Sequence, residues 1–184
     1  MSDPSDLNAF LDHTWQRLSR GVADRRSDAR HVSFSTVSPD GFPQVRTVVL
    51  RAAQKSQNLV EVHTDAASAK IAALAAHPYA QLMVWDEKAR LQIRLDAKVD
   101  VLGGTDVSDT WDRVPPVSRE SYGKTPAPGA PIDEAYAYEL LSDPAAFRVL
   151  RCHVQQIDLV ELGETHRRAT YRIEDDWAGQ WLVP

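Results

Sequence analysis

The chain has 184 residues, of which 43% are hydrophobic and 26% charged, values typical of one soluble globular domain. Its net charge of −5 provides no broad basic field for nucleic acid or an anionic membrane. The single cysteine, Cys152, excludes an internal disulfide, and no group of cysteines and histidines has zinc-site spacing. The acidic, polar first residues are unlike a targeting peptide, and no run approaches the ~20 apolar residues of a membrane span, so we expect a cytoplasmic protein.

An amphipathic helix is predicted at the start of the chain, within residues 1–23. Ser5 or Asp3 can cap it, and the helical pattern should fade near Gly21. Its apolar side chains recur at helical spacing and would pack against a sheet or the end of a barrel. They are Leu7, Phe10, Leu11, Trp15 and Leu18.

Residues 31–51 carry a hairpin pattern. Apolar and polar residues alternate in the first part, residues 38–41 have turn chemistry, and the chain returns through residues 43–51. In the returning strand, period-two geometry places Arg46 on one face and Arg51 on the other. The two arginines therefore cannot serve one site from one face.

A strand that leads directly into a helix is predicted next. After a β-branched run, Thr64-Asp65 forms a good N-cap pair and an alanine-rich segment follows. Ser68 and Lys70 then fall in the first helical turn, where backbone N–H groups and the helix dipole favour a phosphate. Arg46 could supply a bidentate partner from the other side. By spacing alone, however, such residues are more typical of a solvated surface.

The later strands and loops are less uniform. Residues 91–101 alternate so regularly that they predict a long antiparallel strand with one buried face, and Gln92 falls on its polar face. Residues 115–133 are too rich in proline for helix or strand, which predicts a long loop. A later alternation slips near Gln155, which indicates a bulge, and Cys152 falls on the apolar side as a small buried hydrophobe.

Many short strands, few helices and close hairpin turns predict one mainly β domain over residues 1–184, an antiparallel barrel of about six strands. Direct strand-to-strand turns and the lack of a Gly-x-Gly-x-x-Gly motif argue against a parallel dinucleotide-binding sheet. No combination of serine, histidine and aspartate is typical of nucleophilic catalysis. We therefore predict no catalytic residue and no metal site in the chain itself.

The whole string from Arg46 to Lys70 resembles the FMN-binding strand pair and helix of the pyridoxamine phosphate oxidase family, the flavin split barrels. Gln92, residues 128–132 and the last two strands add weaker similarity, so the resemblance covers roughly residues 30–184. It implies a six-stranded Greek-key split barrel with flanking helices. It also implies a homodimer that binds FMN at its interface and uses a small-molecule substrate.

The resemblance also implies roles for individual residues. The FMN phosphate would be held by Arg46, Ser68 and Lys70, and Arg51 and Gln92 are further candidate contacts. The ring and the ribityl chain would be contacted from the strand pair. These strand-pair residues are Thr47, Val48, Val49, His63 and Thr64.

The substrate side of the resemblance is less complete. The family's oxidases hold the substrate phosphate with a lysine at the position of Arg51, and with a tyrosine, an arginine and a serine further on. An ungapped comparison places Trp111, Val114 and Ser118 at those three positions. One charge is thereby lost, although Arg119 could compensate by reaching back across the loop.

The C-terminal strand differs as well, since the family's Arg-x-His is here Arg167-Arg168-Ala169, without the histidine. We therefore expect an FMN-dependent oxidoreductase that acts on a small molecule other than pyridoxamine phosphate. One alternative is a flavin-binding or carrier protein without turnover. Another is the same barrel with haem or a deazaflavin in place of FMN.

Overall fold

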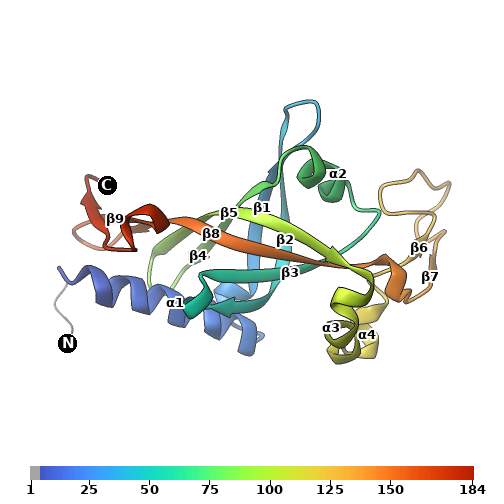
Figure 1. Cartoon of the computed structure of the whole chain (residues 1–184), viewed down its shortest axis with the longest axis horizontal. Helices are drawn as coiled ribbons and strands as arrows, with labels where there is room; N and C mark the ends of the chain where they lie inside the picture. The colour runs from blue at the N-terminus through green and yellow to red at the C-terminus, as the bar shows by residue number, and fades with distance from the viewer. Residues whose placement is uncertain (1–4) are drawn as a thin grey trace.

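The computed structural model describes residues 5–184 and contains a closed antiparallel barrel (Figure 1). Its strands are β1 His31–Val37, β2 Pro43–Gln54, β3 Leu59–Asp65, β4 Tyr79–Asp86, β5 Leu91–Gly103 and β8 Phe147–Glu161. They follow the order β3-β2-β1-β4-β5-β8, and β8 closes the barrel by pairing with β3. Because β4 returns beside β1, the first four strands have the Greek-key order. The predicted Greek-key split barrel with peripheral helices is confirmed.

Strand β8 is 15 residues long and changes its partner along one edge. Its residues 147–153 pair with β3, whereas its residues 156–161 pair with β9, Arg167–Arg172. β10, Gln180–Leu182, pairs in turn with β9. The other edge of β8 pairs with β5, with a register shift at Gln155 that confirms the predicted bulge. As a result, β9 and β10 extend the sheet beyond the closed barrel, as the left side of Figure 1 shows.

The core fills the barrel because alternate residues of each strand point inward. In β5, Leu91, Ile93 and Leu95 are buried while Gln92 and its polar neighbours are partly exposed, which confirms the predicted strand. Cys152 is also fully buried, and burial raises the pKa of its thiol to about 12. It is the small buried hydrophobe that the alternation predicted.

Helix α1, Leu7–Ala23, packs its apolar stripe against this core. The predicted cap was wrong: Asp6 is the N-cap, and its carboxylate accepts a hydrogen bond of 3.0 Å from the backbone N–H of Ala9. Ser5 lies one residue too early, and Asp3 falls outside the described residues. The fully buried members of the stripe are Phe10, Leu11, Trp15 and Leu18.

The prediction that residues 115–133 form a loop without regular structure was wrong in two places. Pro116–Arg119 forms a one-turn helix, α4, because proline is favoured in a first helical turn. Lys124–Thr125 forms β6, which pairs with β7, Glu139–Leu140. A second, smaller core anchors this region to the barrel. It consists of Val107, Val114, Tyr122, Phe147 and Val149.

The remaining helices are short. They are α2 Ala69–Ala76, α3 Ser108–Arg113 and the 3-10 turns Asp28–Arg30, Lys55–Gln57, Gly104–Val107, Pro144–Ala146 and Ile173–Asp175. Within residues 5–184, no helix combines the length and the apolar character that crossing a membrane requires.

Candidate functional site

A cavity of about 370 Å³ opens where the β2–β3 pair, the start of α2 and the segment after α4 meet. It contains all the predicted cofactor contacts except Arg46 and Gln92. Its lining consists of Thr47, Val48, Val49, Arg51, His63, Thr64, Asp65, Ser68, Lys70, Ser121, Tyr122, Lys124 and Pro128.

One corner of the cavity has the chemistry of an anion site. The Lys70 ammonium donates hydrogen bonds to Ser68 Oγ at 2.6 Å and to Thr64 Oγ1 at 2.8 Å. Burial lowers the pKa of Lys70, as does the charge of Arg46, while the charge of Asp65 opposes the shift. Two hydroxyls and an ammonium thus stand together at the positive end of α2, where an anion would be stabilised.

The helix that carries this corner begins later than predicted. Ser68 is the N-cap and Ala69 the first helical residue, so Thr64-Asp65 does not cap α2. Asp65 instead stabilises the turn before the helix, because its Oδ1 accepts a hydrogen bond of 2.7 Å from the N–H of Ala67. Lys70 does lie in the first turn of α2, as predicted.

Arg46 lies beside the anion corner and does not line the cavity. Its guanidinium donates to Thr36 Oγ1 at 2.7 Å, to the Phe34 carbonyl at 3.2 Å and to the side chain of Gln44 at 3.1 Å. These bonds hold it on the opposite face of β2 from Arg51, as period-two geometry required. The charge of Arg46 still lowers the pKa of Lys70, so Arg46 lies near enough to add to the positive potential of the corner. A direct contact between Arg46 and a bound phosphate stays a prediction.

Arg51 enters the cavity at a bulge that the sequence did not reveal. The β2–β3 register shifts by one residue between Leu50 and Ala52, which leaves Arg51 as the extra residue. There it forms a hydrogen bond with Tyr122, and its charge opposes the rise in the Tyr122 pKa that burial causes. Tyr122 was missed as a site residue, and the available signal was an aromatic ring in an otherwise polar, proline-rich segment.

Aromatic rings form the inner wall of the cavity. The rings of His63 and Tyr122 each stand edge-on to Phe147, with centroids 4.9 Å apart in both pairs. Burial, and secondarily the charge of Arg51, lowers the pKa of His63 to about 4. His63 is therefore neutral near pH 7 and adds no charge to the cavity.

The depressed pKa of His63 predicts that the protein loses stability in mild acid. An unfolded histidine titrates near pH ~6.5, so between that pH and about pH 4 the unfolded chain binds a proton that the folded chain rejects. The stabilising effect of a neutral His63 is complete above the unfolded pKa and is lost as the pH falls toward 4. Urea unfolding at about pH 7.5 and about pH 5 should show a smaller decrease for His63→Asn than for the wild type. An equal decrease in both would contradict the shift, and the exposed His13→Asn serves as the control.

Asp65 fixes the wall that carries Tyr122. Its second carboxylate oxygen accepts a hydrogen bond of 2.7 Å from the N–H of Gly123, 58 residues later in the chain. Two further backbone bonds, from Asp143 to Tyr122 and from Leu141 to Gly123, hold the same segment from the other side. Gly123 has φ +77°, and a Cβ there would meet Asp143 at 2.6 Å, so glycine is required.

The predicted substrate-side residues of the long segment do not line the cavity. Arg119 donates to the carbonyls of Trp111, Asp112 and Val114 at 3.0–3.2 Å and lies over the Trp111 ring. It therefore caps the end of α3 and does not compensate for the charge missing at Val114. Val114 itself is buried in the smaller core, and Trp111 stands behind the cavity wall, where its ring contacts those of Tyr122 and Phe147. Ser118 lies in α4, outside the lining.

Gln92 and Arg167 lie at the far end of the barrel from this cavity. Gln92 pairs with Val160 of β8, whereas His63 pairs with Val149 of the same strand. Eleven residues of β8 separate these positions, roughly 35 Å at the rise of an antiparallel strand. Arg167 forms an ion pair of 2.8 Å with Glu161 in the same distant region. One chain does not bring these two residues to its own cavity.

The chain matches the model of a family described as pyridoxamine 5'-phosphate oxidase, FMN-binding domain, over residues 12–103, which are 92 of its 184 residues. The chain belongs to this family. The matched segment contains every predicted cofactor contact, from Arg46 to Gln92.

Known proteins resemble the chain over nearly its full length. The pyridoxine/pyridoxamine 5'-phosphate oxidase 2 of Arabidopsis thaliana is 24% identical, with 92% of this chain and 96% of that protein covered. A pyridoxamine 5'-phosphate oxidase-related, FMN-binding protein of Nostoc punctiforme has a solved structure that matches with a TM-score of 0.77, at 26% identity and full coverage of both chains. PhzG of Burkholderia lata, solved with tetrahydrophenazine-1-carboxylic acid, matches with a TM-score of 0.73 at 18% identity, covering all of this chain and 95% of PhzG. The PhzG match is evidence for the fold alone.

Proposed function

We propose that this protein is an FMN-dependent oxidoreductase that acts on a small molecule. The observation that carries the proposal is the anion corner, in which Lys70, Ser68 and Thr64 converge at the start of α2 inside the family's FMN-binding segment. Bound FMN would supply the redox chemistry, and the chain would bind and orient it. In this division of labour no side chain has to act as a nucleophile or a general base.

The cavity residues divide into two groups in this proposal. Lys70, Ser68 and Thr64 would hold the phosphate through charge-assisted hydrogen bonds, with Arg46 adding positive charge from behind. Thr47, Val48, Val49 and His63 would contact the ribityl chain and the ring. The donor set fits a phosphate, because within residues 5–184 both oxygens of the one carboxylate in the lining, Asp65, already accept backbone N–H groups.

We further propose that two copies form a two-fold homodimer with FMN between them. Gln92 and Arg167 cannot reach the cavity of their own chain, but they could complete that of a partner. The outer face of the barrel also exposes large apolar side chains, with Val45 69% and Tyr79 62% accessible. An isologous contact would cover this face on both copies at once. Light scattering of FMN-loaded protein at micromolar concentration tests the proposal, which a monomer would refute.

An absorption spectrum of the purified protein tests the cofactor. We expect flavin bands, and FMN should be identified in the supernatant after denaturation. Protein that is colourless and does not bind added FMN would overturn the proposal. A haem spectrum would show that the cofactor is haem and not FMN. Flavin that no candidate substrate or reductant bleaches would instead indicate a binding or carrier protein.

We expect slow turnover of pyridoxamine phosphate even when the protein is saturated with FMN. Val114 provides no charge for a substrate phosphate, and Arg119 is engaged with the end of α3. One missing charge-assisted contact corresponds to at least about a tenfold lower kcat/KM. Hydrogen peroxide release, measured beside an authentic oxidase under the same conditions, checks this expectation. Comparable rates would show that this view of the substrate side is incorrect.

A further inference from the structure

A second cavity, of about 410 Å³, lies between α1, the connector of residues 24–30 and the turn from β4 to β5. We call it the α1 cavity. It has the volume of a small-molecule site and shares no lining residue with the first cavity. The chain as a whole is acidic, with a net charge of −5, but this cavity has more cations than carboxylates. Its charged lining consists of Arg17, Arg20, Arg26 and Lys88, with Asp28 and Asp86.

Both carboxylates of the α1 cavity hold its three segments together. Asp86 forms an ion pair with Arg17 of the helix, and its other oxygen accepts a hydrogen bond of 2.9 Å from the N–H of Ala89. Asp28 of the connector accepts a hydrogen bond of 3.1 Å from the N–H of Glu87 in the turn. These contacts join partners that are 69 and 59 positions apart. The cavity is therefore formed before any ligand binds, which lowers the cost of binding one.

The other cations of the α1 cavity are not engaged in this way. Within residues 5–184, neither the guanidinium of Arg26 nor the ammonium of Lys88 takes part in a hydrogen bond or an ion pair. Arg20 contacts Asp24, outside the cavity, through long hydrogen bonds of 3.3 and 3.4 Å. Like charges that face one concave place repel one another, and they raise the local concentration of anions. A bound anion would remove this repulsion.

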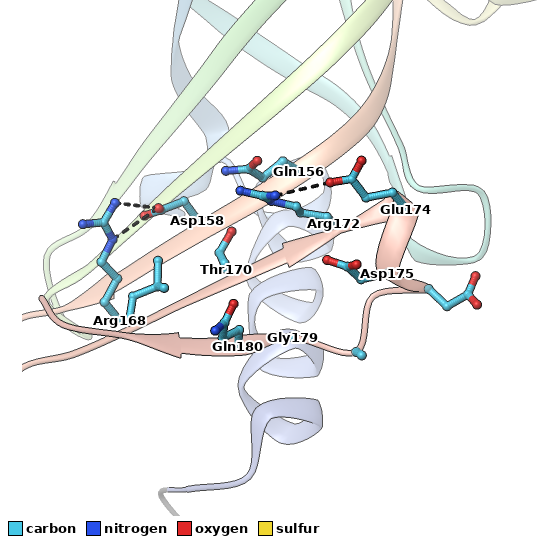
Figure 2. A pocket seen from close by; sticks show the side chains of 12 residues that line it. Gln156, Asp158, Arg168, Thr170, Arg172, Glu174, Asp175, Gly179 and Gln180 are labelled. Carbon is cyan, nitrogen blue, oxygen red and sulfur yellow. Dashed lines mark hydrogen bonds and ion pairs between the residues drawn. The ribbon is translucent and has the colours of Figure 1, made fainter.

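A larger cavity, of about 810 Å³ beside β8, β9 and β10, has the opposite balance of charge (Figure 2). Both of its arginines are paired, Arg168 with Asp158 at 2.9 Å and Arg172 with Glu174 at 3.3 Å. Further aspartates line it, so an anion there would meet net negative charge. The α1 cavity is the one of these two that suits an anion.

We propose that the α1 cavity binds a small anion that carries at least two phosphate groups. Arg20, Arg26 and Lys88 line the cavity from the helix, the connector and the turn, so the ligand has to offer oxygens in several directions. A tetrahedral phosphate does so, whereas a carboxylate offers two oxygens in one plane. Within residues 5–184, no phenyl, phenol or indole ring lines the cavity for a base to stack on, which favours a compact anion over a nucleotide.

Titration calorimetry with inorganic pyrophosphate tests the proposal on protein saturated with FMN, in which the anion corner is occupied. We expect saturable binding. Arg26→Gln and Lys88→Ala should each weaken it about tenfold, and their combination about a hundredfold, because each removes a charge-assisted contact. Arg25→Gln makes the same change in charge at the neighbouring exposed residue, which does not line the cavity, and should bind pyrophosphate as the wild type does.

Two lysine variants separate this site from the anion corner of the first cavity. Lys70→Ala should weaken FMN binding and leave pyrophosphate binding unchanged, whereas Lys88→Ala should have the reverse effects. If Lys70→Ala abolishes pyrophosphate binding and Arg26→Gln does not, the anion occupies the first cavity, and the inference fails while the proposed function stands. If the wild type binds no FMN but its pyrophosphate binding is weakened by Arg26→Gln, the proposed function fails and the inference stands.

Two further results would overturn the inference. The first is the absence of saturable pyrophosphate binding, or an equal loss of affinity in Arg25→Gln and Arg26→Gln, which would show attraction by surface charge without a site. The second comes from citrate, whose several charges are on planar carboxylates. We expect citrate to bind at least about tenfold more weakly than pyrophosphate. Equal affinity for the two anions would overturn the assignment to phosphate.

Discussion

Lys70→Ala should weaken FMN binding at least about tenfold, because it removes a charge-assisted contact that contributes roughly 1.5–3 kcal/mol. The effect should be large because Lys70 also organises the corner, through its bonds to Thr64 and Ser68. Quenching of flavin fluorescence on titration with protein measures the affinity. Lys88→Ala, an exposed lysine on the β4–β5 turn, makes the same change in net charge and should bind FMN normally.

Unchanged affinity in Lys70→Ala would place the phosphate elsewhere. Arg46→Ala combined with Lys70→Ala then becomes decisive, since Arg46 is the adjacent cation. If the double variant also binds FMN as the wild type does, the anion corner is not the phosphate site.

Asp65→Ala should destabilise the fold by about 2–4 kcal/mol, because two backbone N–H groups lose their acceptor in a buried place. Asp65→Asn keeps one acceptor oxygen and should lose about half as much. The same changes should free the segment after α4, since the bond to Gly123 fixes it. Urea unfolding measures the first effect, and limited proteolysis within residues 120–141 measures the second.

Asp40→Asn, in the exposed turn between β1 and β2, is the matched control for these variants and should change neither quantity. If Asp65→Ala unfolds at the same urea concentration as Asp40→Asn, the two bonds do not stabilise the native state. If Asp65→Ala is cleaved faster but has the same urea midpoint as the wild type, Asp65 holds only the cavity wall and does not stabilise the whole fold.

Much of the barrel could be predicted because its strands follow local rules. The alternation in β5 and the slip at Gln155 can each be recognised from the order of neighbouring residues in the sequence, and both are present in the structure. The anion corner was also predictable, since Thr64, Ser68 and Lys70 lie within seven positions. The helix start was misplaced because Asp65 and Ser68 are both good caps, and the long-range bond to Gly123 engages Asp65 elsewhere.

Other features depend on contacts between distant residues and were therefore missed. The bulge at Arg51 follows from the pairing of β2 with β3, which no local pattern records. Tyr122 reaches the cavity through long-range contacts, which include the packing of its ring against Phe147, 25 positions later, and the bond from Gly123 to Asp65. From the sequence, Arg119 could have contacted a substrate phosphate. In the structure its guanidinium instead donates hydrogen bonds to the carbonyls of Val114 and Trp111 at the end of α3.

The double pairing of β8 has a consequence for how the chain reaches its native state. The contact that closes the barrel joins residues such as Val62 and Leu150, which are 88 positions apart. Such non-local pairing forms slowly, because the entropy of closing a long loop is lost before the stabilising contacts between the strands form. Until β8 is synthesised and arrives, β3 and β5 each present a bare, hydrogen-bonding edge that can recruit strands from other chains. Residues 12–103, which match the family model, contain five of the six barrel strands and leave the barrel open until β8, Phe147–Glu161, pairs with β3 and β5.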